Sequence, residues 1–331
     1  MTKRQVSAKD VAELAGVSRT AVSRAFTPGA SVAKDTRARI EAAAEQLGYQ
    51  VNHLARGLIT ARTNLVALIA AEVNTPYRSA LLAALTERLQ SAGKVGLLIN
   101  TDRSDDSVAQ ALRQAIAYRT DAAIVLSGMP DGSLSETCLK NGMRLVLINR
   151  NELRPGTLTI RVDDEDAGRR AFAALWAAGC RRLALANSRA GTASLEDRAA
   201  GFRAAAAATG VDIAEEAIGA TSYQTGLDLG TRLLGGPDRP DGIFCTTDLI
   251  ACGVMDAARH RFGVSVPEEL SVIGFDDIEQ AGWEAYALTT FRQPVEDIAR
   301  AAVATLAGEM AEAPQRITIP TRLMWRSSIR K

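Results

Sequence analysis

The stretch that decides the fold is Val11-Ala12-Glu13-Leu14-Ala15-Gly16-Val17-Ser18-Arg19-Thr20-Ala21-Val22-Ser23-Arg24-Ala25-Phe26. Ser7 stands where a helix N-cap is expected, and Asp10 three residues later completes an acidic form of the capping box. Gly16 supplies a tight turn, because glycine adopts backbone angles that a residue with a Cβ resists. Ser18 caps a second helix, and apolar residues recur at helical spacing on both sides of the turn. The stretch predicts a helix-turn-helix, whose second helix can enter the major groove of DNA.

The exposed side of the second expected helix carries polar side chains that suit nucleic acid, namely Arg19, Thr20, Ser23 and Arg24. An arginine can bond two acceptors of one guanine, and a Ser or Thr hydroxyl serves either a base edge or a phosphate. A small helical hairpin with a solvated face would show the same pattern. A third helix is expected from about Asp35 to Leu47, with Gly48 ending it.

Charge is distributed unevenly along the 331 residues. The whole chain has a net charge of +1, but residues 1–62 hold ten Lys and Arg against five Asp and Glu, and the remainder holds 29 against 33. A basic head on a slightly acidic body fits a polyanion that is bound by the head. The alternative is that the uneven distribution of charge arose by chance and has no function.

Motifs along the whole chain follow one order. The first part contains Ser7-x-x-Asp10-Val11-Ala12-x-Leu14-Ala15-Gly16-Val17-Ser18, Val22-Ser23-Arg24, Thr36-Arg37 and Leu47-Gly48-Tyr49. The later part contains Arg198-x-x-Gly201-Phe202, the run VPEELSVIGFDD at residues 266–277, and Leu288-Thr289-Thr290. Together these motifs resemble the lactose/galactose repressor family of transcriptional regulators, and the resemblance covers essentially the whole chain.

The resemblance implies a DNA-binding headpiece over residues 1–49, a hinge helix over 50–62, and an effector-binding and dimerisation domain over 63–331. The family's hinge helix folds in the DNA minor groove, where an apolar side chain wedges between base pairs. Val51 replaces the usual proline and Gly57 lies inside the expected helix, so a plain linker is the alternative. The residues that match DNA-binding positions of the family are Ser7, Val17, Ser18, Arg19, Thr20, Ser23, Arg24, Asn52, Ala55 and the wedge, Leu58.

From residue 63 short apolar strands alternate with amphipathic helices, which is typical of parallel sheets covered on both faces. The expected strands are Leu65–Ala70, Val95–Asn100, Ala122–Leu126, Leu145–Ile148, Leu183–Ala186, Gly242–Cys245 and Ser271–Phe275. The expected helices include Ala80–Ser91, Asp166–Ala178, Arg198–Thr209, Tyr223–Leu234, Leu249–Phe262 and Val295–Glu309. The resemblance implies a periplasmic-binding-protein-like α/β domain with two doubly wound parallel sheets. Its expected parts are an N-lobe of about 63–160 and 292–320, and a C-lobe of about 161–291 and 321–331.

Ligands of such sheets lie beyond the carboxyl ends of the strands, so the effector is expected in a cleft between the lobes. The candidate residues are Tyr77, Arg78, Arg150, Asp163, Arg198, Thr221, Thr247 and Asp276. In the family, the positions matched by Arg198 and Asp276 bind effector hydroxyls or polar ring groups, and each of these side chains can hold two neighbouring hydroxyls. Three alternatives stay open: Arg198 could pair with Asp276, Asp163 could only cap a helix, and Tyr77 could belong to the core.

Three features of these candidates depart from the family pattern. Thr247 stands where an asparagine is common, Thr221 where an aromatic residue often stacks on the effector, and arginines occupy positions 78 and 150. Arginine clusters favour planar anions that two N–H groups can bind at once. We therefore expect a sugar acid or a sugar phosphate as the effector, unless Arg78 or Arg150 points outward or pairs with a nearby carboxylate.

These patterns favour a homodimeric, cytoplasmic repressor that a small effector releases from palindromic DNA. A corepressor-dependent regulator and a periplasmic sugar-binding protein are the alternatives, and the second lacks support because no secretory signal follows Met1. No stretch of ~20 apolar residues predicts a membrane span. No nucleotide-binding fingerprint or nucleophile–base pattern indicates an enzyme, and no cofactor or metal is expected. The cysteines fit buried thiols in a reducing compartment: Cys138, Cys180, Cys245 and Cys252.

Overall fold

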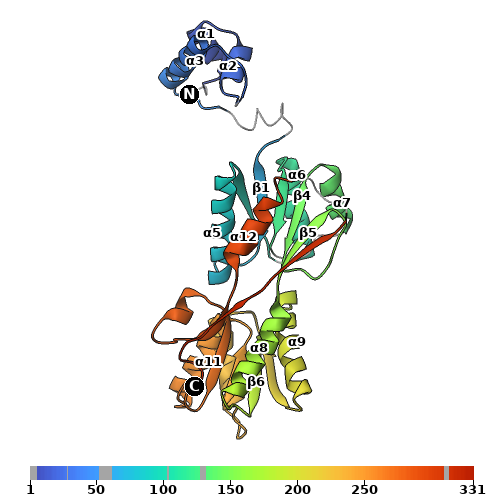
Figure 1. Ribbon diagram of the computed structural model, residues 1–331, viewed down its shortest axis with the longest axis vertical. Helices are drawn as coiled ribbons and strands as arrows, with labels where there is room; N and C mark the ends of the chain where they lie inside the picture. The colour runs from blue at the N-terminus through green and yellow to red at the C-terminus, as the bar shows by residue number, and fades with distance from the viewer. Residues whose placement is uncertain (1–5, 28, 52–61, 103, 127–131, 309–312) are drawn as a thin grey trace. The chain divides into compact units, whose positions relative to one another are not determined.

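The structure, a computed structural model, describes residues 6–27, 29–51, 62–102, 104–126, 132–308 and 313–331. The chain divides into two compact units, Met1–Thr63 and Asn64–Lys331, and Figure 1 labels the elements of both. None of the described helices is long and apolar enough to cross a membrane.

The first unit contains the predicted helix-turn-helix and a third helix: α1 (Ala8–Ala15), α2 (Arg19–Ala25) and α3 (Lys34–Leu47). The Ser7 backbone N–H donates to the Asp10 carboxylate at 2.8 Å, and the Ala21 N–H donates to Ser18 Oγ at 3.2 Å. Gly16 adopts a φ of +66° in the turn. The alanines of the buried core let the helices approach closely. The core consists of Val11, Ala12, Ala15, Val22, Ala25, Ile40, Ala43 and Ala44.

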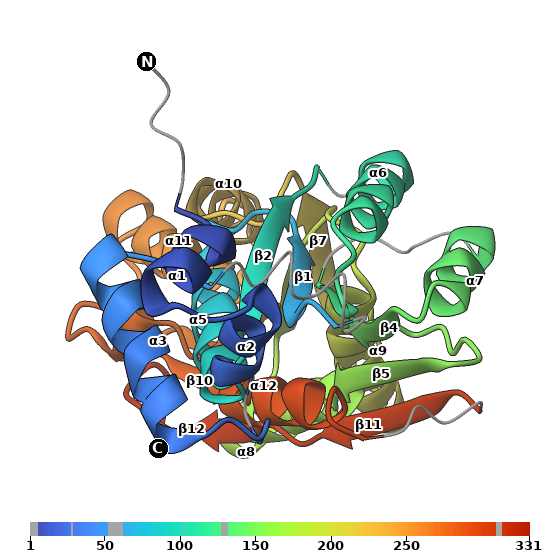
Figure 2. The ribbon, with the colours of Figure 1, turned by 90° about the horizontal axis from the view of Figure 1, so that it is seen from above.

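The second unit contains two six-stranded sheets, and the first of them is parallel throughout its described pairs. In spatial order its strands are β11 (Gln315–Ile319), β5 (Thr157–Val162), β4 (Arg144–Ile148), β3 (Ala122–Val125), β1 (Leu65–Ala70) and β2 (Val95–Asn100). The helices α5 (Pro76–Ser91) and α12 (Val295–Ala304) cover one face. The helices α6 (Asp105–Ala117) and α7 (Gly132–Lys140) cover the other face (Figure 2). This sheet and its four helices are called the N-lobe below.

The second sheet, with its own helices, forms the C-lobe. Its spatial order is β12 (Arg322–Met324), β10 (Thr289–Arg292), β9 (Ser271–Asp276), β8 (Gly242–Cys245), β6 (Leu183–Ser188) and β7 (Ile213–Ile218). The edge strand β12 runs antiparallel to β10, so this sheet is mostly rather than wholly parallel. One face carries α8 (Asp164–Ala177) and α9 (Ala193–Ala208), and the other carries α10 (Tyr223–Leu234) and α11 (Asp248–Arg261).

The chain passes between the lobes three times: from β5 into α8, from β10 into α12, and from β11 into β12. The carboxyl ends of the parallel strands in both sheets therefore lie near these passages, because β5 and β10 each leave their sheet there. This topology creates the space between the lobes in which polar side chains from both sheets meet.

Helices α8 and α9 approach each other at two glycines. A Cβ on Gly168 would lie 2.1 Å from the Arg198 carbonyl oxygen, and a Cβ on Gly201 would lie 1.9 Å from the Glu165 carbonyl oxygen. Distances this short are forbidden for any residue with a side chain, so the two backbones can touch only at glycine. The close crossing sets how far α9 stands from the start of α8, where the buried charges of the pocket lie.

Candidate functional site

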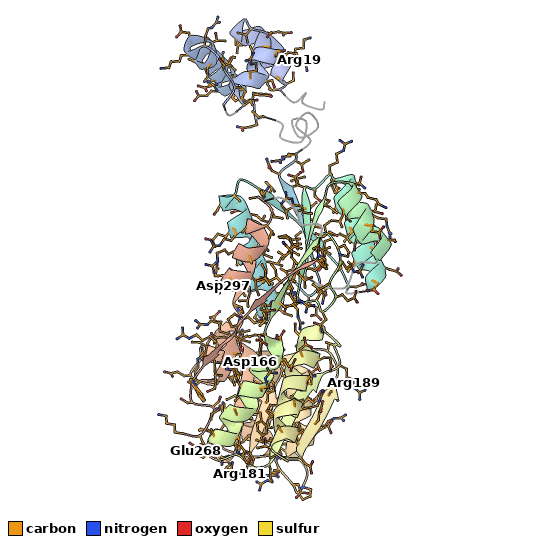
Figure 3. All side chains as sticks on the ribbon, turned by 45° about the vertical axis from the view of Figure 1, so that its right-hand side comes forward. Arg19, Asp166, Arg181, Arg189, Glu268 and Asp297 are labelled. Atoms are coloured by element: carbon orange, nitrogen blue, oxygen red, sulfur yellow. The ribbon has the colours of Figure 1, made fainter. Side chains whose placement is uncertain are left out.

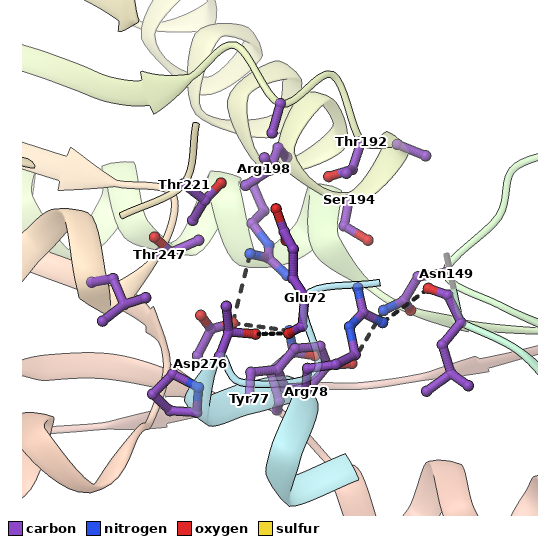
Figure 4. A pocket seen from close by; sticks show the side chains of 18 of the residues that line it. Glu72, Tyr77, Arg78, Asn149, Thr192, Ser194, Arg198, Thr221, Thr247 and Asp276 are labelled. Atoms are coloured by element: carbon purple, nitrogen blue, oxygen red, sulfur yellow. Dashed lines mark hydrogen bonds and ion pairs between the residues drawn. The ribbon is translucent and has the colours of Figure 1, made fainter. Parts of the chain in front are cut away.

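A cavity of about 280 Å³ lies between the lobes at the carboxyl ends of their strands (Figure 4). Segments that follow β1, β3, β4, β6, β7, β8, β9 and β10 all contribute to its wall. The lining residues are Glu72, Thr75, Pro76, Tyr77, Arg78, Leu126, Asn149, Arg150, Ala190, Gly191, Thr192, Ala193, Ser194, Leu195, Arg198, Thr221, Thr247, Leu249, Asp276, Ile278 and Gln293.

The structure brings most of the expected effector residues together at this cavity. Those in its lining are Tyr77, Arg78, Arg150, Arg198, Thr221, Thr247 and Asp276. Asp163 is outside the lining, because its carboxylate accepts the Asp166 backbone N–H at 3.2 Å and caps α8. Asp163 therefore acts as a helix cap, which was the alternative to a place in the pocket.

Arg198 is the most enclosed charge in the lining, with 3% of its surface exposed. Its Nε donates to Asp164 Oδ1 at 2.8 Å, and its Nη1 donates to the Thr246 carbonyl oxygen at 2.8 Å. The same Nη1 lies 3.8 Å from Asp276 Oδ1. Arg198 does lie near Asp276, as the alternative expected, but this is the longer of its two carboxylate contacts. The nearer partner is Asp164, which the sequence analysis did not single out.

The position of Arg198 along its helix differs from the prediction. A helix start at Arg198 is wrong, since α9 begins at Ala193 with Thr192 in extended backbone geometry before it. The first turn of α9 therefore lies in the pocket, and Arg198 extends from its second turn. Likewise α5 begins at Pro76 rather than Ala80, because proline suits the first turn of a helix.

Asp276 is held at the end of β9 in a backbone conformation with a φ of +129°. The Gln293 side-chain amide donates to Asp276 Oδ1 at 3.0 Å. Burial raises the pKa of Asp276 to about 6, and the nearby Arg198 guanidinium opposes this rise. Positive φ in residues other than glycine is uncommon, and the contacts with Gln293 and Arg198 hold the Asp276 side chain in this conformation.

Asp248 lies behind the pocket and is fully buried at the start of α11. Its carboxylate accepts the Thr290 hydroxyl at 2.5 Å and the Ile278 backbone N–H at 2.9 Å. Burial raises the pKa of Asp248 from 3.8 to about 8, with a further rise from the neighbouring Asp276 carboxylate. Two buried carboxyl groups therefore support the same wall of the pocket.

The stability of the protein is expected to fall as pH rises from 6 to 8. The folded-state pKa of Asp248 lies above its unfolded value, so the folded chain binds more protons across this window and loses stability as pH increases. The slope from this group is at most about 1.4 kcal/mol per pH unit. The measurement is the melting temperature in buffers from pH 5 to 9. Asp248→Asn is expected to flatten the profile, because an amide can still bond both Thr290 and Ile278; a parallel profile would contradict the assignment.

Tyr77 belongs to both the pocket and the packed interior. Its hydroxyl accepts a hydrogen bond from the Asn149 side-chain amide at 3.2 Å, and its ring packs against the main core. Burial raises the pKa of Tyr77 above 10.0. Tyr77 therefore lines the pocket, as predicted, and also packs against the core, as the alternative expected.

Several lining residues escaped the sequence reasoning, namely Glu72, Asn149, Thr192, Ser194 and Gln293. Glu72, Asn149 and Gln293 each come just after the end of a strand of the sheets. The rule that ligands lie at carboxyl ends of parallel strands could have found Glu72 and Asn149, because the ends of β1 and β4 were predicted correctly. Gln293 could not be found in this way, because β10 was not predicted. Thr192 and Ser194 precede and begin α9, which was expected to start later.

In the headpiece, Ser18, Arg19, Thr20, Ser23 and Arg24 are exposed on or just before α2, and Figure 3 labels Arg19. Ser7 and Val17 are half-buried, and Ser7 is bonded to Asp10. The expected minor-groove residues Asn52, Ala55 and Leu58 lie outside the described residues. Across the described ranges, no three His, Cys, Asp or Glu side chains gather where they could hold a metal ion.

Comparisons with known proteins match both units. The family model for bacterial regulatory proteins of the lacI family matches residues 7–52, and the model for a periplasmic binding protein-like domain matches residues 172–329. The transcriptional regulator GalR of Escherichia coli (strain K12) is 31% identical over 310 residues, which cover 92% of this chain and 88% of GalR. The regulator DegA of Bacillus subtilis (strain 168) is 30% identical over 96% of each chain.

Solved structures share the fold. A lac repressor dimer bound to operator and the anti-inducer ONPF has a TM-score of 0.88 at 23% identity, covering 99% of this chain and 100% of that chain. A complex of the transcriptional regulator CelR with cellobiose has a TM-score of 0.70 at 26% identity, covering 98% and 100%. Headpiece, two-lobed domain and interlobe pocket together define a class of DNA-binding transcriptional regulators. Within this class, the chain belongs to the LacI family.

Proposed function

We propose that the protein is a homodimeric repressor that leaves a palindromic operator when a small hydroxylated effector binds between its lobes. The pocket carries this proposal, because its wall combines charged and hydroxyl side chains from both lobes. A ligand that touches both lobes shifts their arrangement if it binds the two arrangements unequally, and the coupling is reciprocal with DNA binding. We further propose a sugar acid or a sugar phosphate as the effector, since three arginines line the pocket.

Known proteins of this fold support the dimer, the binding of DNA and a carbohydrate-type effector. The lac repressor structure is a dimer bound to operator, and a two-fold dimer presents two headpieces to two half-sites. The CelR structure contains cellobiose, and a LacI family regulator from Enterococcus faecium contains ribose. The sugars bound to these two proteins support a carbohydrate-type effector here.

Selection of bound sequences from a random DNA pool, followed by release assays, tests the proposal. We expect an enriched sequence with two-fold symmetry, and we expect the effector to weaken binding to it. An effector that strengthens binding would favour the corepressor-dependent alternative. Absence of any enriched sequence, with properly folded full-length protein, would contradict sequence-specific repression.

Thr20→Ala is expected to relax the base preference at one position in each half-site. Thr20 is exposed at the start of α2, the helix that would enter the major groove. Loss of one specific base contact costs about 1–3 kcal/mol at the preferred base, which is roughly a 5- to 150-fold drop in affinity for that operator. The measurement is binding to a set of singly substituted operators, with exposed Gln46→Ala on α3 as the control. Equal weakening on every operator would mean that Thr20 contacts only phosphate.

A further inference from the structure

The two walls of the pocket carry opposite charge among the residues that the structure describes. The N-lobe wall presents Arg78 and Arg150 against one carboxylate, Glu72. The C-lobe wall presents one cation, Arg198, against the carboxylates of Asp276 and of Asp164 directly behind it. The described N-lobe wall is therefore net positive, and the C-lobe wall is net negative.

The two N-lobe guanidinium groups are fixed at the ends of neighbouring strands. Arg78 Nη1 donates to the Leu126 carbonyl oxygen at 2.9 Å, just beyond β3. Arg150 Nη1 donates to the Asn149 carbonyl oxygen at 3.2 Å, just beyond β4. Strands β3 and β4 are paired in parallel, so both guanidinium groups are anchored at the same edge of the N-lobe sheet, and both line the cavity. Planar guanidinium groups on one wall of a pocket suit a carboxylate or a phosphate.

The C-lobe wall offers hydroxyl groups beside its carboxylate. Thr221 Oγ1 lies 2.7 Å from Ser188 Oγ, and the Thr247 hydroxyl lies at the start of α11. Thr192 and Ser194 line the same side at the start of α9. A hydroxyl both donates and accepts, and a carboxylate accepts from several hydroxyls, so this wall matches a chain of alcohol groups. A second anionic group would fit the C-lobe wall poorly, because the Asp276 carboxylate would repel that group.

We infer that the pocket takes a polyhydroxylated acid in one orientation, with the acid group against Arg78 and Arg150 of the N-lobe and the hydroxyls against Asp276, Thr247 and Thr221 of the C-lobe. This inference rests on the proposed function and deepens it, since it assigns each end of the effector to one lobe. Only a ligand with both kinds of group engages both walls fully. A neutral sugar lacks the group for the N-lobe, and a simple fatty acid lacks the groups for the C-lobe.

The test is a thermal-shift screen followed by calorimetric titration of the full-length protein. The probes are aldonic acids of several stereochemistries, hexose 6-phosphates, the matching neutral sugars and alditols, and hexanoate, all at one ionic strength. A ligand of the native state must raise the melting temperature. We expect at least one hydroxylated acid to give a larger shift than its neutral partner and than hexanoate. An equal or larger response to the neutral partner, or no response to any acid, overturns the inference.

Variants then separate the two ends of the bound acid. Arg78→Gln and Arg150→Gln are each expected to lower the affinity for the acid at least tenfold and to change the affinity for its neutral partner by less than threefold. Thr247→Val is expected to lower the affinity for both ligands by a similar factor. Arg88→Gln, on the same helix as Arg78 but with its side chain near Glu296 instead of the pocket, is the matched control. Equal losses for acid and neutral ligand in the arginine variants would overturn the assignment, because they would indicate a general structural effect.

The outcome for the inference is separable from the outcome for the proposed function. Operator binding is measured on the same preparations, with and without each ligand. A protein that binds its operator and responds only to neutral sugars keeps the proposed function and rejects the inference. A protein that binds the acid but selects no DNA rejects the repressor while keeping the assignment of the pocket.

Discussion

Gly201→Ala is expected to destabilise the effector-binding unit by about 3 kcal/mol, at the upper end of the range for overpacking. A Cβ at this position would lie 1.9 Å from the Glu165 carbonyl oxygen on α8. Backbone cannot yield as a flexible side chain can, so α9 must move away from α8. The same movement would separate Arg198 from Asp164, which are bonded at 2.8 Å across this helix pair. Ligand affinity is therefore expected to fall together with stability.

The measurement is denaturant unfolding of full-length protein, followed by tryptophan fluorescence and by circular dichroism. Gly236→Ala is the control, because a Cβ there would meet nothing within 4 Å and its φ is not positive. The control is expected to stay within about 0.5 kcal/mol of the unchanged protein, as surface substitutions usually do. Similar midpoints for both variants would show that α8 and α9 can separate at little cost.

Arg198→Met is expected to cost about 3–5 kcal/mol, which is typical when one partner of a buried ion pair is removed. The substitution leaves Asp164 with 2% exposure and no guanidinium beside it, and it removes the cation closest to Asp276. Burial already raises the pKa of Asp164, and Arg198 opposes that rise. In the variant the carboxyl is expected to stay protonated to higher pH, so the destabilisation should grow as pH increases from 5 to 8.

Comparison with a double variant isolates the pair. Asp164→Asn together with Arg198→Met is expected to recover part of the stability lost in Arg198→Met, because no buried carboxylate remains at position 164. The coupling energy comes from unfolding the unchanged protein, Asp164→Asn, Arg198→Met and the double variant at pH 5 and pH 8. Additive effects, with no dependence on pH, would show that Asp164 does not depend on Arg198 for its charge.

The strands that the sequence predicted are runs of apolar residues. Strands β1, β2 and β8 have the predicted bounds, although β2 is a largely exposed edge strand. Strands β5, β7, β10 and β11 were not among the predicted strands. In β7 and β11 the runs IAEEAI and QRITI mix charged and apolar residues at the edges of their sheets. An edge strand exposes much of its surface, so its hydrophobic pattern is weak. The pairing of β11 with β5 joins residues far apart in sequence, which no local pattern can show.

The same limit applies to the pocket. Arg150 comes just after β4, and Arg78 lies in the first turn of the helix that follows β1. Both were found because their position along the chain already places them at the cleft. Asp164 was missed because its role depends on the crossing of α8 and α9, which brings it to Arg198 from 34 residues away. Asp163, its neighbour, was chosen because it lies at the start of the C-lobe, but its side chain turns back to cap its own helix. Spacing identifies the end of an element, and only packing decides which side chain there faces the ligand.

The three passages between the lobes also bear on how the protein is made. A ribosome that has completed α8, α9 and α10 has not yet synthesised β11 or β12, which occupy the last part of the chain and form one edge of each sheet. Domains generally fold as units during synthesis. The described helices of the headpiece, α1 to α3, are synthesised early, because this unit ends before residue 64. Neither lobe can close its sheet until the C-terminal residues emerge. The headpiece of a nascent chain can therefore fold well before the two sheets that form the pocket are complete.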